Sequence, residues 1–245
     1  MLHYDVKAIC VEGMEMKRTE NVIETRSLGE QVYQYLCSQI INGNIRYGET
    51  LNIKAIAKEL NISPMPIREA IKRLENEGLV LIKPRSMCML REPTRDSILN
   101  AISMRELLEI YCVETVYRTV APEGLDTLKE ITKRMAVIVA QKEKGNDADI
   151  SSYIKNDGQF HMALCHLADN PFIDKSYREI SLHLNMNHLY SIGCPPDIIQ
   201  THKDHCDLLE ALESHSAQAV VIIKKHLKQS RMNVLKGNLF STMSG

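Results

Sequence analysis

Residues 62–80, ISPMPIREAIKRLENEGLV, indicate a short amphipathic helix that begins on a serine and two prolines. Prolines are tolerated in the first helical turn, because the backbone N–H groups there have no partner within the helix. Ser63 is a natural N-cap, and Gly78 is suited to end the helix. Between them, apolar side chains recur at the i, i+3, i+4 and i+7 spacing of one helix face. They are Ile67, Ala70, Ile71 and Leu74.

A second short helix precedes this one closely, and a pair with so tight a turn is typical of a helix-turn-helix. Its apolar positions are Ile53, Ile56, Ala57 and Leu60, which leaves residues 61–63 for the turn. An earlier helix begins at Leu28. After Gly78, two β-prone runs, LVLIKP and MCMLR, flank a turn at residues 84–86 and predict a β-hairpin, or wing. Residues 27–93 are therefore expected to form a winged helix-turn-helix.

The sequence after Pro93 has helical periodicity only. Six amphipathic segments predict helices at residues 95–120, 125–143, 150–169, 171–191, 197–214 and 216–237. Helices with such short connections are typical of a bundle. We therefore expect a mainly α protein with a flexible tail at 1–26, the winged head at 27–93 and an all-α domain at 94–245.

The composition is that of a soluble globular protein. The chain has 245 residues, of which 44% are apolar and 25% charged, enough for one large or two modest domains. No apolar run approaches the ~20 residues that span a membrane, and the first residues lack the pattern of a secretion signal. Seven cysteines without a C-x-x-C pair favour reduced thiols. These features predict a cytoplasmic location and no membrane partner.

Charge is distributed unevenly along the chain, although the net charge is only −1. Residues 27–95 carry ten Lys and Arg against seven Asp and Glu, whereas residues 96–245 carry sixteen against nineteen. This mild asymmetry permits a DNA-contacting head on a neutral-to-acidic body, but it does not require one.

The segment SLGEQVYQYL…LENEGLV, residues 27–80, resembles the DNA-binding head of the GntR family of bacterial transcription regulators. Three motifs fall in register: the turn GNIRYGETL, the helix start SPMPIREAI and the helix exit LENEGLV. The resemblance implies that the helix after Ser63 enters the major groove of double-stranded DNA. The residues expected at the DNA are Lys54, Ser63, Met65, Arg68, Lys72, Lys83 and Arg85.

Arg68 is the best candidate for a bidentate contact to a guanine, and Lys54 and Lys72 would hold phosphates. The helix N-terminus, with open N–H groups and a positive dipole end, would also suit a phosphate or a base edge. Considered alone, the helix has another interpretation. Its basic residues, with an i, i+4 pair between Glu69 and Arg73, would form a solvated face.

Two positions depart from the family pattern. Many members have an arginine directly after the capping serine, where this chain has Pro64, so one DNA contact is expected to be missing. The wing usually carries a glycine near its tip, where this chain has Met87. The minor-groove contacts of Lys83 and Arg85 are therefore left open.

Three of the predicted bundle helices carry polar residues on their apolar faces. In YIKNDGQFHMALCH, one helix face holds Asp157 and His161 together with Ile154 and Leu164. His205 shares a stripe with leucines and His226 with isoleucines. Because burying an unpaired charge is costly, this set suggests a divalent transition metal. Three imidazoles and one carboxylate suit Zn²⁺, with Ni²⁺ or Mn²⁺ as alternatives, better than Ca²⁺ or Mg²⁺. Alternatively, each histidine is a separate hydrogen-bonded core residue.

The same four residues, Asp157, His161, His205 and His226, match the metal-binding pattern of the FCD domain of the FadR subfamily of GntR regulators. The matching motifs are DGQFH, HCDLLEAL and KKHL, and a looser similarity covers residues from about 100 to 235. The resemblance implies a metal that helps to bind a carboxylate-bearing metabolite.

Arg105 is a further candidate for effector binding, because SMRELLEIY resembles the R-x-x-L-E of the first FCD helix. An inward guanidinium near the metal would grip a carboxylate with two charge-assisted hydrogen bonds. An ordinary i, i+4 salt bridge to Glu109 is an equal alternative. Asn187 is a second candidate for contact with the effector.

The sequence thus predicts a metabolite-responsive transcription regulator, most simply a repressor, that binds a two-fold symmetric operator as a homodimer. Helices 95–120 and 125–143 are candidate dimer surfaces. One alternative is a metal-dependent hydrolase with an appended head, although no general base is placed by spacing and Glu109 and His166 are only the nearest candidates. Another alternative is a regulator whose metal is purely structural. No catalytic residue is predicted.

Overall fold

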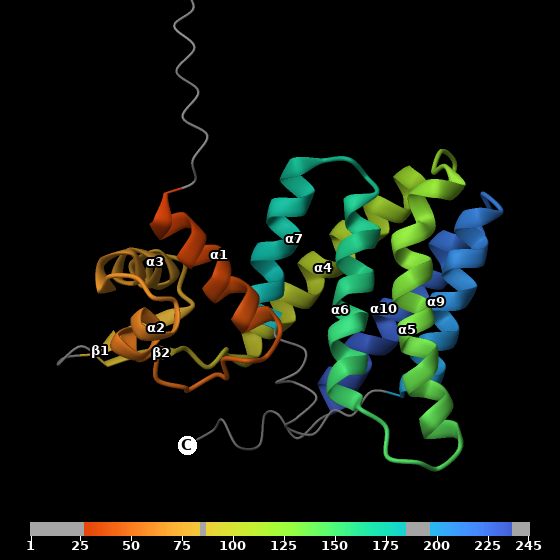
Figure 1. Ribbon diagram of the computed structural model, residues 1–245. Coiled ribbons are helices and arrows are strands. Elements are labelled where there is room, and N and C mark those ends of the chain that lie inside the picture. Colours follow the sequence, from red (N-terminus) through yellow and green to blue (C-terminus); the bar gives the residue numbers. More distant parts are fainter. Residues whose placement is uncertain (1–26, 84–86, 185–196, 237–245) are drawn as a thin grey trace, which may run out of the picture.

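The computed structural model describes residues 27–83, 87–184 and 197–236, which form a small N-terminal head and a larger helical body (Figure 1). The head contains α1 (Leu28–Ile41), α2 (Ile53–Glu59), α3 (Pro64–Asn76), β1 (Val80–Lys83) and β2 (Met87–Leu90). The body contains α4 (Arg95–Val116), the 3₁₀-helix η1 (Pro122–Leu125), α5 (Asp126–Glu143), α6 (Ile150–His166), α7 (Pro171–Leu184), α9 (Ile198–Glu213) and α10 (Gln218–Lys236). The predicted tail at 1–26, the wing turn at 84–86 and Asn187 lie outside the described residues.

The start of α3 differs from the prediction in one detail. Ser63 occupies the N-cap position, but its side chain makes no capping hydrogen bond. A serine cap usually accepts from the N–H of the second or third helical residue, and the third is Pro66, which has no N–H. Of the first three residues of α3, only Met65 keeps a backbone donor. The helix ends as predicted, with Gly78 at φ +78° just beyond it.

The wing and the head core complete a winged helix-turn-helix, as predicted. β1 pairs antiparallel with β2, with Val80 opposite Leu90 and Lys83 opposite Met87. The apolar faces of α1 and α3 meet above this hairpin and bury their side chains almost completely. The most buried members of the head core are Leu36, Ile40, Ile67, Ile71, Leu74, Val80 and Leu90.

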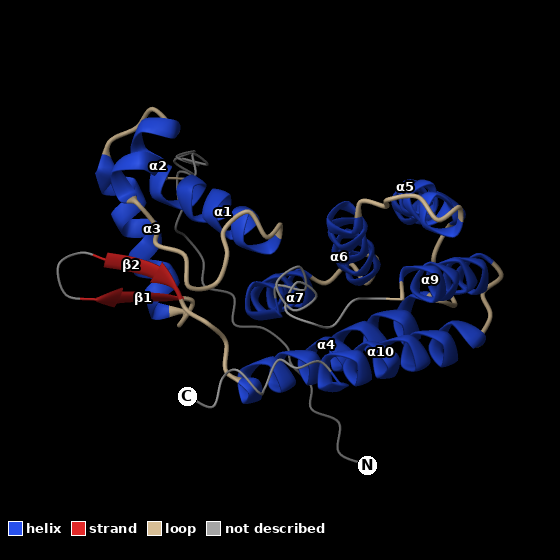
Figure 2. Cartoon of the chain, turned by 90° about the horizontal axis from the view of Figure 1, so that it is seen from below, coloured by secondary structure: helices blue, strands red, loops and turns tan. Residues whose placement is uncertain are grey.

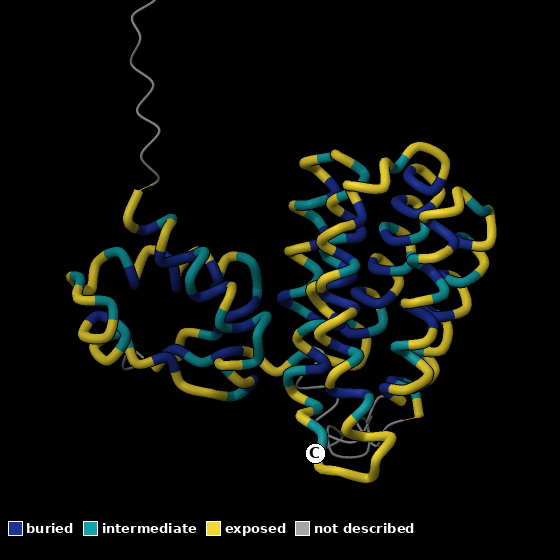
Figure 3. Tube along the Cα trace, turned by 45° about the vertical axis from the view of Figure 1, so that its right-hand side comes forward, coloured by how far each residue is buried: buried dark blue, intermediate teal, exposed yellow. Residues whose placement is uncertain are grey.

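The body is a helical bundle in which α4 and α10 lie side by side across the other helices (Figure 2). Buried residues line the facing sides of the helices, and exposed residues cover the outside (Figure 3). This arrangement follows from the apolar stripes of each helix, because an amphipathic helix buries one face. The predicted mainly α fold is confirmed. The centre of the core contains Val113, Leu125, Leu128, Met135, Phe160, Leu164, Leu212 and Ile223.

The body helices are shorter than predicted at several ends. α4 ends at Val116 rather than at residue 120, and α6 ends at His166 rather than at residue 169. Asp169 takes a left-handed backbone conformation with φ +47° just before α7 begins at Pro171. Apolar periodicity continues through such turns, so it overestimates helix length.

The head rests on the C-terminal end of α7. The hydroxyl of Tyr47 donates to the main-chain carbonyls of Leu182, at 3.2 Å, and His183, at 3.0 Å. The Leu182 side chain is only 2% exposed and packs in the head core. Arg178 Nη1 donates to Gln34 Oε1 of α1 at 3.3 Å. One body helix is thus part of the head's packing.

Candidate metal centre and nucleic-acid interface

Three histidine side chains from three helices converge inside the body. His161 of α6 has its Nε2 atom 3.3 Å from Nε2 of His205 in α9 and 3.2 Å from Nε2 of His226 in α10. The three residues are 0%, 1% and 6% exposed. The inward orientation predicted from the apolar stripes is confirmed for all three.

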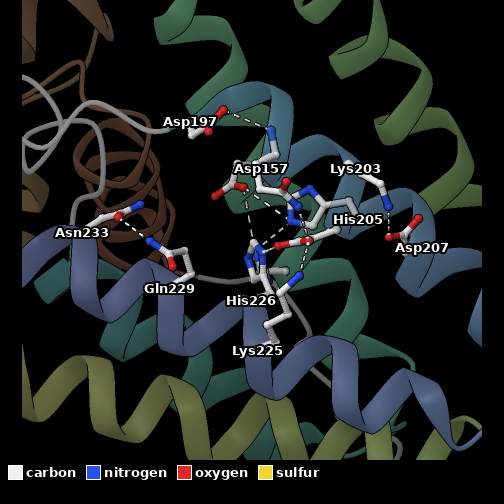
Figure 4. Close-up of polar contacts among 12 residues, drawn as sticks. Asp157, Asp197, Lys203, His205, Asp207, Lys225, His226, Gln229 and Asn233 are labelled. Atoms are coloured by element: carbon white, nitrogen blue, oxygen red, sulfur yellow. Dashed lines mark hydrogen bonds and ion pairs between the residues drawn. The ribbon is translucent and has the colours of Figure 1, made fainter.

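Asp157 lies one helical turn before His161 and faces the same point (Figure 4). Its Oδ1 atom is 3.8 Å from His161 Nε2 and 3.6 Å from His205 Nε2. Within the described residues, this buried oxygen has no hydrogen-bond partner. A buried carboxylate oxygen without a partner is costly. The centre therefore offers a buried carboxylate oxygen that could take part in binding a cation.

The donor set fits a transition metal. Ligand atoms around Zn²⁺ lie roughly 3.0–3.4 Å apart, because each Zn–N bond is about 2.0–2.1 Å long. The two Nε2–Nε2 distances from His161, 3.3 and 3.2 Å, agree with this spacing, and the ligand atoms of the three histidines all lie within 4.8 Å of one another. Burial lowers the pKa of His161, and burial beside two other imidazoles holds the pKa of His205 well below its ordinary value. Both rings are thus kept neutral, as metal binding requires.

Glu109 of α4 orients the His161 ring through its Nδ1 atom, the ring nitrogen that does not face the other histidines. Its Oε2 atom accepts from His161 Nδ1 at 2.7 Å, and its Oε1 atom accepts from Arg105 Nε at 2.6 Å and from the Tyr177 hydroxyl at 2.7 Å. Burial alone would raise the pKa of the Glu109 carboxyl, but Arg105 and His161 hold it well below its usual value. An ionised Glu109 keeps the His161 proton on Nδ1 and leaves Nε2 free for a ligand.

Asp204 of α9 lies beside the Nδ1 atom of His226, as Glu109 lies beside that of His161. Its Oδ2 atom is 3.6 Å from His226 Nδ1, and its Oδ1 atom accepts from Gln200 Nε2 at 2.8 Å. Burial would raise the pKa of Asp204, but its contacts with His226 and Gln200 lower it. The sequence analysis missed Asp204 and Tyr177 as partners of the centre. The R-x-x-L-E motif, which ends at Glu109, is the sequence feature that indicates Glu109 as a partner of the centre.

The inward orientation predicted for Arg105 and its alternative, the salt bridge to Glu109, are both present, and the contact with an effector stays a prediction. The Arg105 side chain points inward, with 7% of the residue exposed, and it also forms the i, i+4 salt bridge to Glu109. It lines a cavity of about 350 Å³ between α1, α6 and α7 that Asp157 also lines. None of the three histidines contributes to the wall of this cavity.

A second cavity is also lined by Asp157, and it reaches one of the three histidines, His226. It has a volume of about 490 Å³, and Asp157 and His226 form its inner wall. The remainder of the wall is polar and includes Thr201, Gln229 and Asn233. Figure 4 shows Gln229 and Asn233, which line this cavity, on α10. We call it the metal-side cavity.

The predicted DNA-contacting residues lie on the exposed surface of the head. Met65 is 62% exposed at the start of α3, and Arg68 and Lys72 follow on the outer side of that helix. Arg68 makes no hydrogen bond or ion pair within the described residues, whereas Lys72 pairs with Glu75. Lys54 and Lys83 are also exposed, and Arg85 lies outside the described part of the chain.

Arg73 contributes to the packing of the head. It pairs with Glu30 of α1 and with Glu77, and its guanidinium carbon lies 3.6 Å from the centre of the Tyr33 ring. The predicted pair between Glu69 and Arg73 is not formed, because α1 supplies a closer carboxylate. Arg73 therefore holds α3 against α1, whereas the exposed Arg68 side chain remains available for contact with DNA.

A winged helix-turn-helix joined to a helical body is an architecture of DNA-binding transcription regulators. Residues 28–89 match the profile described as "Bacterial regulatory proteins, gntR family", and residues 100–229 match that of the FCD domain. The second match spans more than half of the chain. The protein belongs to the GntR family of transcription regulators and carries an FCD ligand-binding domain.

Characterised relatives agree with this assignment. The transcriptional repressor RspR of Escherichia coli strain K12 is 20% identical over 208 residues, which cover 84% of this chain and 88% of RspR. The regulator McbR of the same strain is 22% identical over 211 residues, or 85% of this chain and 93% of McbR. A solved structure of E. coli McbR/YncC, 21% identical, superposes with a TM-score of 0.74 over 86% of this chain and 99% of that chain.

These families and relatives are DNA-binding regulators and not enzymes. The two general bases considered for the enzyme alternative do not change this conclusion. Glu109 is ionised and held by three donors, and His166 is exposed and paired with Asp174. Among the described helices, none is both long and apolar enough to cross a membrane.

Proposed function

We propose that this GntR regulator is a homodimeric repressor that acts in the cytoplasm and senses a small carboxylate through a metal in its FCD domain. The observation that carries the proposal is the buried Oδ1 of Asp157, which faces three imidazole nitrogens and has no partner within the described residues. The alternative hypothesis for the same centre is a metal with a purely structural role.

Asp157, His161, His205 and His226 would hold the metal. Zn²⁺ suits this set of neutral imidazoles and one carboxylate, and Ni²⁺ or Mn²⁺ are alternatives. When bound, the metal supplies positive charge for a carboxylate oxygen of the effector. Glu109 and Asp204 fix the rings of His161 and His226 from outside.

The metal-side cavity supports a small polar effector. Its wall joins His226 and Asp157 to hydrogen-bonding side chains such as Thr201 and Gln229. The wall also includes the donors Lys225 and Ser230 and two further carboxylates, Asp197 and Asp204, so the charge of the metal would be needed to hold an effector carboxylate there. Arg105 and Asn187 remain proposed effector contacts, although Arg105 lines the other cavity, beyond Asp157.

The exposed surface of α3 supports DNA binding. Arg68 is the proposed reader of a guanine, and the Ser63 hydroxyl, which does not cap α3, is available for a phosphate. The full proposed set is Lys54, Ser63, Met65, Arg68, Lys72, Lys83 and Arg85. We place the DNA-binding domain at residues 27–93 and the effector and dimerisation domain at 94–245.

A homodimer would bring two heads onto a two-fold symmetric operator. Exposed apolar side chains on α4 support this body surface as the interface. Met104, Leu107 and Tyr111 are 42%, 63% and 53% exposed and follow one another at helical spacing. On α5, Val137 is 63% exposed. Such residues are candidates for burial between subunits.

A chain of contacts could carry the state of the metal centre to the head. Tyr177 of α7 donates to Glu109, which holds His161. Less than two turns later, Leu182 of the same helix packs in the head core, and Tyr47 donates to its carbonyl. A shift of α7 would therefore move the head relative to its partner in a dimer.

The test begins with the metal content of the purified protein beside a double variant, His161→Ala with His205→Ala. About one metal per chain, lost in the variant, would support the sensor centre. Operator binding is then measured with and without simple carboxylates such as acetate and citrate. A metal that is present while no carboxylate alters DNA binding would favour the structural alternative. No metal in either protein, even after Zn²⁺ or Ni²⁺ is added, would overturn the proposal.

A further inference from the structure

The two prolines at the start of α3 remove most of the polar character of its first turn. Pro64 and Pro66 have no backbone N–H, so Met65 carries the one open main-chain donor among the first three residues of the helix. A helix N-terminus binds phosphate through several such donors. The main chain at this end of α3 is therefore poorly suited to hold a DNA phosphate, and its side chains are apolar.

Met65 projects from this turn into solvent. It is 62% exposed, more than any other large apolar residue in the described part of the head. A single exposed apolar residue is ordinary on a protein surface, but this one stands at the start of the helix that is proposed to contact DNA. α1 lies between α3 and the body helices (Figure 1), and the body does not cover Met65.

One base offers an apolar group in the major groove. Guanine, adenine and cytosine present hydrogen-bond donors and acceptors there, whereas thymine also presents its C5-methyl group. A methionine side chain is at most a weak hydrogen-bond acceptor. It is unbranched and flexible, so it can adapt to the position of a small apolar group. Contact with a thymine methyl is therefore the base readout that the chemistry of Met65 favours.

The position of Arg68 indicates where this thymine lies. Met65 and Arg68 are three residues apart, so their side chains are neighbours on one face of α3, about 4.5 Å apart along the helix axis. Successive base pairs of DNA are about 3.4 Å apart. Arg68 is exposed, makes no hydrogen bond or ion pair within the described residues, and is the proposed reader of a guanine. The two side chains therefore reach bases no more than about two pairs apart.

We propose that Met65 reads the C5-methyl group of a thymine within about two base pairs of the guanine that Arg68 contacts. This assignment rests on the proposed function, because α3 must be the helix that contacts DNA. Pro64 and Pro66 hold their φ angles near −65°. The backbone that carries Met65 is thus ordered before DNA binds, which lowers the entropic cost of the contact.

The test replaces thymine with 2′-deoxyuridine, which removes only the C5-methyl group and keeps the base pair. A duplex is first selected from a random pool with the full-length protein. Each thymine of its half-sites is then replaced in turn, and fluorescence anisotropy measures the affinity. We expect one position at which the wild type binds about fourfold more weakly per half-site, or ~0.8 kcal/mol, the contribution of one buried methylene-sized group.

Three variants connect this effect to the side chain. Met65→Ala should bind the thymine duplex more weakly and show no further loss with deoxyuridine at that position. Met65→Leu keeps an apolar side chain of similar size and should keep the sensitivity to deoxyuridine. Met232→Ala is the matched control, because it truncates a methionine on α10 that is 39% exposed. It should respond to deoxyuridine like the wild type.

Two results would overturn the role of Met65 and leave DNA binding by α3 intact. In the first, no thymine replacement weakens binding by the wild type. In the second, the loss with deoxyuridine is equally large in Met65→Ala, which would show that the methyl group acts through another residue or through the deformability of the DNA. Failure to select any duplex would instead overturn the proposed function of α3, and the role of Met65 with it.

Discussion

The hydroxyl of Tyr47 in the head donates to the main-chain carbonyl of His183, 3.0 Å away at the end of α7 in the body. These two residues are 136 positions apart in the chain. Tyr47 is only 8% exposed, and burial raises the pKa of its hydroxyl well above the ordinary value. The hydroxyl therefore stays protonated and available as a donor between the two domains.

Tyr47→Phe should loosen the head without unfolding it. The substitution removes the donor to two carbonyls and keeps the buried ring, so we expect a loss of about 1–3 kcal/mol in the stability of this contact. Amide hydrogen exchange should increase at the C-terminal end of α7 and leave the metal centre unchanged. Tyr35→Phe is the matched control, because the Tyr35 hydroxyl bonds Glu59 within the head. Equal exchange in both variants would show that Tyr47 does not hold the domains together.

Glu109→Gln should weaken metal binding. The change removes the negative charge shared by Arg105, His161 and Tyr177, and loss of such an outer partner typically lowers metal affinity about 10–100-fold. It also leaves the buried Arg105 without its ion pair, which typically costs about 3–5 kcal/mol of folding stability.

Competition with a chelator measures the affinity, and thermal unfolding measures the stability. Glu106→Gln controls for charge on the same helix, because Glu106 pairs with a partly exposed Arg231. An unchanged metal affinity in Glu109→Gln would show that Glu109 does not orient His161.

Local periodicity accounts for most of what the sequence could predict. The α3 stripe from Ile67 to Leu74, the wing and the body helices all follow from patterns within about twenty residues. The same patterns predicted that Asp157 and His161 face inward, because each shares a helix face with apolar residues. They suggested a shared metal but could not show that these faces meet at one point, and the resemblance to FCD domains supported it.

The remainder of the site depends on contacts between distant segments. Nothing in the sequence around Tyr177 indicates its bond to Glu109, 68 positions earlier. No local sequence pattern indicates the contact between Tyr47 and α7 either. The missing cap at Ser63 is different, since Pro66 removes one of the two backbone donors that a serine cap usually uses, and the sequence alone shows this.

Arg68→Ala and Arg73→Ala should separate DNA binding from head stability. Arg68 has no hydrogen bond or ion pair within the described residues, so its loss should leave stability within about 0.5 kcal/mol. Operator binding should fall by about 1–3 kcal/mol and lose specificity at one base pair.

Arg73→Ala should have the opposite effect, because Arg73 joins α3 to Glu30 and Tyr33 of α1. We expect a lower melting temperature with DNA affinity retained by the folded fraction. Fluorescence anisotropy on operator and scrambled duplexes, beside thermal unfolding, measures both properties. If Arg73→Ala impaired operator binding more than Arg68→Ala at equal folded fraction, the proposed reader on α3 would be wrong.

Metal removal should destabilise the body more than the head. Without a cation, the Oδ1 atom of Asp157 is buried against three imidazoles and has no partner among the described residues. A ligand at about 100 times its Kd adds ~2.7 kcal/mol to folding stability, so a chelator should lower the melting temperature by several degrees. Re-addition of Zn²⁺ should restore it. His166→Ala should respond like the wild type, because His166 is exposed and lies outside the centre, whereas His205→Ala should respond to neither chelator nor metal. A chelator effect that persists in His205→Ala would place the stabilising metal somewhere other than among these four residues.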